Sequence, residues 1–177
     1  VQGEFWTGSI PTFDARAAMV SSIAHTTGKK LVTSESFTAY LSHSMAEQTF
    51  DRIKVLGDRA WCNGYNAFWL HELAHNPYPG LRPGMYFGVW GTLFNPNAMP
   101  WRDQFPAWSD YVARSQALLQ EGRYVADFLL HDPSDLAMTA PIAGFPFGWR
   151  FDFAHDDTIM ALRIENGLLK LPSGMEY

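Results

Sequence analysis

The chain has 177 residues, 47% of them hydrophobic and 15% aromatic, which is enough apolar material for one core and suggests one domain. Its net charge is −5, its pI is near 5.6, and it has no block of Lys and Arg, which argues against nucleic acid or an anionic membrane as the main partner. The single cysteine, Cys62, excludes an internal disulfide and a multi-cysteine metal site. No window approaches the roughly 20 apolar residues of a membrane span.

The first third of the chain predicts a strand, a helix and a second strand. Residues 4–6 are typical of the end of a strand. From Thr12 the apolar residues fall on one helical face, and Gly28 ends that helix. Residues 31–38 begin with apolar and β-branched side chains and predict a short buried strand with Glu35 at its C-terminal end. A carboxylate mounted there is held rigidly while it reaches a cleft; the alternative is a structural carboxylate that caps a helix or pairs with a basic side chain.

The same alternation of helix and strand continues along the chain. Further helices are predicted at 47–63 and 106–121, and further strands at 65–70 and 124–130. The Pro- and Gly-rich segment 77–91 is too long for a plain connector, and such loops are usually functional. Strands that alternate with helices predict parallel pairing with right-handed crossovers.

We therefore predict an α/β fold that forms part of a (β/α)8 TIM-type barrel of about four β/α units, whose active site would lie at the rim formed by the strand ends. This half-barrel would occupy residues 1–135, and residues 136–177 would form an antiparallel β exit segment with a hairpin turn at Asn166-Gly167. A small doubly wound sheet is the competing architecture. Polar side chains stand at each of the predicted strand ends, namely Glu4, Glu35, His71 and His131-Asp132.

The two ends of the chain suggest a piece of a longer protein. Val1 is not Met, and the predicted strands make half of a barrel. The remainder of the parent chain is therefore an expected partner. We expect the piece to fold poorly alone, because an open half-barrel leaves unpaired strand edges.

Residues 71–75 spell the HExxH pattern of zinc peptidases, in which a helix brings both histidines to one Zn²⁺. Here the pattern follows a predicted strand and is broken by Pro77 and Pro79, so at most one helical turn could form. A zinc metallopeptidase is therefore only the third hypothesis. His71 and His75 are better explained as polar rim residues that touch a ligand, and the alternative is loop histidines bonded to the backbone.

Glu4 and Glu35 end successive predicted strands and should share one neighbourhood of the rim. Paired carboxylates suit glycoside hydrolysis, in which one donates a proton and the other activates water or attacks. They also suit calcium, which prefers several hard oxygens. The sequence leaves these roles open. Patterns for a serine nucleophile elbow, a dinucleotide-binding loop and a phosphate-binding loop are absent.

Aromatic residues are numerous, with 7 Trp and 13 Phe. Surplus aromatics often line a pocket in which sugar rings stack, and the alternative is an aromatic-rich core.

An ordered series of motifs over nearly the whole chain resembles the α-L-rhamnosidases of glycoside hydrolase family 106. These motifs are GEFW at 3–6, AHTTGK at 24–29, ESFT at 35–38, KVLGD at 54–58, GYN at 64–66 with His71 and His75, PGM at 83–85, YVARSQ at 111–116, LQEG at 119–122, VAD at 125–127, FDF at 151–153, NG at 166–167 and LPSG at 171–174.

The resemblance implies a large, inverting, multi-domain glycosidase with a catalytic barrel and active-site calcium. Such an enzyme releases terminal L-rhamnose from complex polysaccharides, in the periplasm or outside the cell. By motif, Glu35 is the expected general base, and Glu4 is a second catalytic carboxylate that serves as a calcium ligand or sugar contact. The family's general acid belongs to an Asp-Ser-x-Glu motif that this sequence lacks, so we expect this piece to be inactive alone. Asn66, His71 and His75 are expected sugar or metal contacts, and Trp69 and Trp90 are further expected substrate contacts.

The hypothesis from another class is a non-catalytic carbohydrate-binding relative. In it, aromatic residues such as Trp69, Trp90 and Trp101 would grip a sugar without hydrolysing it.

Overall fold

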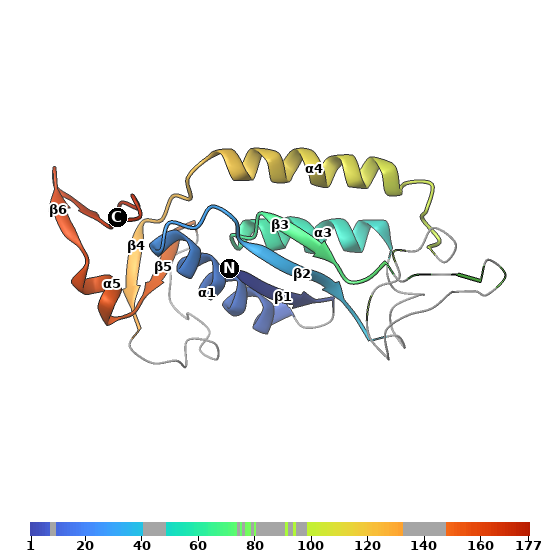
Figure 1. The fold of residues 1–177 in the computed structure, drawn as a ribbon, viewed down its shortest axis with the longest axis horizontal. Helices are drawn as coiled ribbons and strands as arrows, with labels where there is room; N and C mark the ends of the chain where they lie inside the picture. The colour runs from blue at the N-terminus through green and yellow to red at the C-terminus, as the bar shows by residue number, and fades with distance from the viewer. Residues whose placement is uncertain are drawn as a thin grey trace.

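The structure, a computed structural model, describes residues 1–7, 10–40, 49–73, 75, 77–78, 80, 91, 94, 99–132 and 148–177 (Figure 1). The elements in chain order are β1 (Gln2–Trp6), α1 (Ile10–Thr26), β2 (Thr33–Thr38), α3 (Phe50–Cys62), β3 (Ala67–Leu70), α4 (Phe105–Glu121), β4 (Phe128–His131), β5 (Phe151–Ala154), α5 (Asp156–Met160), β6 (Arg163–Glu165) and β7 (Leu168–Lys170). No helix within these ranges has the length and apolar character needed to cross a membrane.

The predicted mixture of helices and parallel strands is confirmed for the first half of the chain. Strands β1, β2 and β3 pair in parallel in that order, and a helix follows each of the first two. The described strands do not form one continuous sheet, however. They form three small, unclosed sheets, namely β1–β2–β3, β4–β5 and β6–β7.

Strand β4 pairs with β5, and its start is fixed by hydrogen bonds between two residues that are far apart in the sequence, Asp127 and Arg150. The Asp127 backbone N–H donates to the carbonyl of Arg150, and the Arg150 N–H donates back to the Asp127 carboxylate, each at 2.8 Å. These bonds start β4 beside β5. The two strands are parallel, so the antiparallel pairing expected throughout residues 136–177 is wrong for β5.

Antiparallel pairing is confirmed for β6 and β7. Asn166 and Gly167 join them with positive φ angles of 54° and 79°, as the two-residue turn of a hairpin requires. The division of the chain at residue 135 stays a prediction.

The β4–β5 sheet lies beside α1 (Figure 1), and Asp152 of β5 joins the two. Asp152 is fully buried, and its carboxylate lies 2.8 Å from His25 Nδ1 and accepts a 2.9 Å bond from the Tyr177 hydroxyl. Burial, followed by the neighbouring Asp152 charge, raises the pKa of Tyr177, so this phenol remains a donor. Asp152 thus links α1, β5 and the last residue of the chain.

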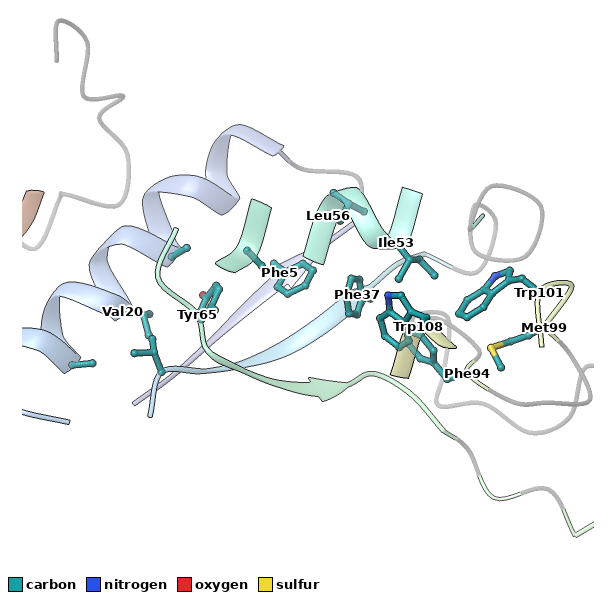
Figure 2. Packing of buried hydrophobic residues seen from close by; sticks show 14 residues of the cluster. Phe5, Val20, Phe37, Ile53, Leu56, Tyr65, Phe94, Met99, Trp101 and Trp108 are labelled. Atoms are coloured by element: carbon teal, nitrogen blue, oxygen red, sulfur yellow. The ribbon is translucent and has the colours of Figure 1, made fainter. Parts of the chain in front are cut away.

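The main core lies between the three-stranded sheet and the helices α1, α3 and α4 (Figure 2). The contributing helix residues include Val20, Ile53 and Trp108, and Phe5 and Phe37 face them from the strands. Trp101 is also buried in this cluster, at 7% exposure. It packs against Phe94, Phe105 and Trp108, so it is a core residue and not the sugar contact considered above.

Tyr65 fills the space beside β1 that Gly3 leaves open. A Cβ on Gly3 would lie 2.2 Å from the Tyr65 hydroxyl, which explains the need for glycine. Burial raises the pKa of Tyr65 to about 12. The phenol is therefore neutral at physiological pH, and this side of the sheet carries no charge from it.

A β-bulge at Phe37 interrupts the pairing of β1 with β2. Glu4 pairs with Glu35, but the next matched pair is Trp6 with Thr38, so β2 holds one extra residue there. Phe37 has φ 66°, a conformation that costs a non-glycine residue about 1–3 kcal/mol. Its ring is fully buried among four aromatic rings, which hold the strained residue in place. They belong to Phe5, Phe68, Phe94 and Trp108, with centroids at 4.8, 5.5, 5.9 and 5.8 Å.

We predict that residues 1–177, expressed alone, lack a sharp thermal transition. β1 and β3 are the outer strands of the described three-stranded sheet, and Trp69 and Leu118 are 64% and 77% exposed. Unpaired edges and uncovered apolar surface favour association over cooperative folding. Calorimetry should show a broad transition, and the dye ANS should bind. A cooperative transition from a monomer would contradict this expectation.

Candidate active site

Glu4 and Glu35 are in-register partners on adjacent parallel strands, and Trp69 of β3 continues the row. In-register residues of a parallel pair point to the same face, on strands about 4.8 Å apart. Their neighbours Phe5, Ser34 and Ser36 are buried on the opposite, core-facing side. The structure therefore brings the two predicted carboxylates together on the face that points away from the core.

The sequence predicts Glu35 at the end of its strand, but β2 continues three residues further, to Thr38. The bulge accounts for this extension. It lets Phe37 enter the core while Thr38 returns to the face of Glu35, where it reaches the same histidine.

A hollow of about 470 Å³ lies beside the two carboxylates. Helix α1 lines it with Arg16, Met19 and Val20, and the strands contribute Glu4 and Glu35. The Glu35 side chain is 41% exposed, so its carboxylate reaches solvent at this face. The arrangement can present two carboxylates to one ligand.

His71 stands at the end of β3 and contacts Glu35. Its Nδ1 lies 3.3 Å from Glu35 Oε1 and 3.1 Å from Thr38 Oγ1, and its backbone N–H donates to the carbonyl of Ser36 at 3.0 Å. The contact with Thr38 has hydrogen-bond geometry, and the Glu35 oxygen lies at ion-pair distance from the same ring nitrogen. His71 is thereby held beside Glu35, where a protonated ring would pair with the carboxylate.

Trp6 contacts Glu4 in a comparable way. Its indole Nε1–H donates to Glu4 Oε1 at 2.5 Å. The Trp6 ring packs against Tyr40 with centroids 5.1 Å apart. Sequence reasoning assigned no site role to Trp6, Thr38 or Tyr40. Their position at the ends of two strands that carry carboxylates was the available signal.

Asn66, predicted as a sugar or metal contact, is instead part of the framework. It is 8% exposed, and its side chain accepts from the Val32 N–H and donates to the carbonyl of Lys30, both at 2.9 Å. Both ends of the amide are thus occupied in joining β3 to the segment before β2, away from Glu4 and Glu35. Its role as a sugar or metal contact stays a prediction, which these bonds do not support.

The remaining predicted site residues are placed apart from this cluster or fall outside the described ranges. His75 is exposed, four residues beyond His71. Trp90 lies outside the described residues. His131 lies in the separate β4–β5 sheet, where its Nε2 is 2.6 Å from Asp156 Oδ1, so it does not share a rim with Glu35.

The described geometry gives no support to a zinc peptidase site. His71 and Glu72 form a turn after β3, whereas the HExxH site requires a helix. Across the described ranges, no three His, Cys, Asp or Glu side chains are grouped so that they could hold a metal ion. Calcium takes about six to eight oxygen ligands, and the carboxylates of Glu4 and Glu35 alone do not complete such a set.

The chain matches a protein family over its whole length, and proteins similar to it include the two that follow. All of residues 1–177 match the glycoside hydrolase 106 family, described as alpha-L-rhamnosidase. A protein from Formosa agariphila named "Putative beta-glucuronidase" is 36% identical over 179 aligned residues, which cover 100% of this chain and 15% of that protein. The structure of a rhamnosidase from Novosphingobium sp. PP1Y superimposes with a TM-score of 0.88 at 27% identity, covering 99% of this chain and 17% of that one. The chain therefore spans a small part of the length of these relatives.

The geometry of Asn66 predicts a structural role that can be measured. In the full-length protein, Asn66→Ala should lower stability by about 1–3 kcal/mol, because the buried Val32 N–H and the partly buried Lys30 carbonyl lose their partner. The Michaelis constant should stay unchanged. Thermal melting and steady-state kinetics test the two expectations, and Asn63→Ala, at a half-buried position on the end of α3, should melt closer to the wild type. Normal stability with a raised Michaelis constant would restore the sugar-contact assignment.

Proposed function

This chain belongs to the glycoside hydrolase 106 family of alpha-L-rhamnosidases, and on that premise we propose that it carries the general base of an inverting glycosidase. Glu35 is the proposed base. The observation that carries the proposal is the in-register pair Glu4–Glu35 on an open face beside a hollow. A carboxylate held on a rigid strand and open to solvent is what a general base requires.

In the proposed reaction, Glu35 removes a proton from water as that water attacks the anomeric carbon of the sugar. His71 supports this role, because its Nδ1 lies 3.3 Å from Glu35 Oε1 and can take up or release a proton beside the base. The anomeric configuration inverts, since water enters opposite the leaving oxygen.

Glu4 is not the proton donor in this proposal. The acid and base of an inverting pair are roughly 6.5–9.5 Å apart, which leaves room for the water. Glu4 and Glu35 sit on adjacent strands only about 4.8 Å apart. We assign Glu4 to the substrate or to a cation, and the general acid to another part of the full-length protein.

The proposed setting is part of a (β/α)8 barrel. Parallel strands β1 to β3, with helices packed on one face and carboxylates on the other, match that architecture. The remainder of the parent chain would supply the other strands. Similarity to a rhamnosidase structure over 99% of this chain supports the idea.

The proposed substrate is a terminal L-rhamnose on an oligo- or polysaccharide, met in the periplasm or outside the cell. The family description and the rhamnosidase neighbour support rhamnose. The name of the Formosa relative makes a β-glucuronide the appropriate competing substrate. Arg16, which lines the hollow, is a cation that a uronate would use and that neutral rhamnose would not require.

The carbohydrate-binding alternative lacks a specific observation in its favour. One of its three tryptophans, Trp101, is buried in the core. Turnover by the full-length protein separates binding from hydrolysis directly.

We predict that Glu35→Gln in the full-length protein lowers turnover of an aryl α-L-rhamnoside by several orders of magnitude. The amide cannot accept the proton, whereas substrate binding changes little. The control is Glu121→Gln, since the Glu121 side chain is 80% exposed at the end of α4 and should be neutral. Glu35→Ala with azide should yield the glycosyl azide of inverted configuration, because azide needs no base. Near-normal turnover of Glu35→Gln would reject the assignment, and turnover of the β-glucuronide alone would reject rhamnose.

Calcium at this site is a separate part of the proposal, with Glu4 as the protein ligand. Two carboxylates side by side repel each other, and a bound cation would relieve that repulsion. The described residues do not complete the oxygen set, so no catalytic step above depends on the ion. Metal analysis should find calcium in the purified full-length protein, with less retained in Glu4→Gln. Equal calcium content in both proteins would exclude Glu4 as its ligand.

A further inference from the structure

The contact between Trp6 and Glu4 has a defined direction. An indole nitrogen can only donate, so Trp6 Nε1–H donates to Glu4 Oε1, and at 2.5 Å the bond is short. A bond to a charged acceptor is stronger and more directional than one between neutral groups. Trp6 thus fixes one oxygen of Glu4. Within the described ranges no side chain donates to Oε2, the oxygen that Glu4 can offer to a ligand.

The backbone explains why the two side chains meet. Residues two apart in a strand point to the same face, so Trp6 stands directly beyond Glu4 on β1. The bulge then aligns Trp6 with Thr38 of β2. Trp6 is therefore held at the end of the strand that carries Glu4.

Tyr40 limits the freedom of the Trp6 ring. The two rings are tilted at 51° with centroids 5.1 Å apart, a favourable arrangement for aromatic pairs. Tyr40 itself is 55% exposed, so the contact is not enforced by burial in the core. Its effect is to restrict rotation of the indole that donates to Glu4.

We propose that Trp6 is a positioning residue that orients Glu4 through its indole N–H, with Tyr40 supporting the indole ring. The inference rests on the proposed function, because it assigns a partner to one carboxylate of that site. According to this inference, Trp6 acts on Glu4 through its N–H and not through its ring surface.

The alternative role for Trp6 is a stacking platform for the sugar, and substitutions separate the two roles. Trp6→Phe keeps an aromatic ring and removes the donor. The proposal expects kcat to fall about 10- to 100-fold, as when a supporting hydrogen bond to a site ligand is removed, with the Michaelis constant and melting temperature nearly unchanged. A stacking platform would instead show a raised Michaelis constant and a retained kcat.

The matched control is Trp149→Phe, the same change at a tryptophan that is 47% exposed and packs against Phe128 of the separate β4–β5 sheet. It should leave kcat near the wild-type value. Tyr40→Ala should lower kcat several-fold and Tyr40→Phe should not, because only the ring is needed. In the Trp6→Phe background Tyr40→Ala should have no further effect on kcat.

All variants are assayed in the full-length protein on the aryl α-L-rhamnoside, beside the wild type and Glu35→Gln. Wild-type turnover that is lost in Glu35→Gln establishes the proposed function independently. Full kcat in Trp6→Phe, or an equal loss in Trp149→Phe, then overturns the positioning role alone. If Trp6→Phe does not fold, the Tyr40→Ala and Tyr40→Phe pair decides, and equal kcat in the two variants overturns the inference.

Discussion

The pairing of β1 with β2 is the constraint on which the rest of the site depends, and the buried ring of Phe37 holds that pairing in its particular register. A strand without a bulge would alternate faces regularly after Glu35 and would direct Phe37 outward and Thr38 into the core. The left-handed backbone at Phe37 reverses this. Contacts with four aromatic rings offset the cost of this backbone conformation. Strained residues of this kind persist where the surrounding core over-determines them, and they cluster at functional sites.

The sheet separates two chemical environments. On the core side, Gly3 makes room for the neutral phenol of Tyr65, and aromatic and aliphatic side chains fill the space up to the helices. On the other side, Glu4 and Glu35 face solvent with donors beside them, the indole N–H of Trp6 and the imidazole of His71. Charged groups are costly to bury. Because the carboxylates lie on one face of the sheet and the core on the other, a rigid, dry core can support a polar surface directly across the sheet.

Local signals in the sequence predicted the elements well, and long-range contacts decided what the sequence could not show. Asn166-Gly167 gave the hairpin because its turn conformation is encoded by those residues alone. Glu4 and Glu35 were placed together because parallel strands follow from the alternation of elements. The bulge was not predicted, since its positive φ falls on Phe37 and not on a glycine. The parallel pairing of β5 depends on Asp127 and Arg150, and the framework role of Asn66 depends on backbone groups of Lys30 and Val32. None of these contacts leaves a periodic trace.

The position of β1 explains why Glu4 and Glu35 are supported differently. Glu35 lies on the central strand of the described sheet and can be held from β3 through His71. Glu4 lies on the outer strand, where the described sheet offers a neighbour on one side only, and that neighbour presents another carboxylate. Within the described sheet, a donor for Glu4 must therefore come from its own strand. Trp6, two residues further along β1, meets this requirement. Its side chain is long enough to reach back to the Glu4 carboxylate, and its indole nitrogen can only donate a hydrogen bond.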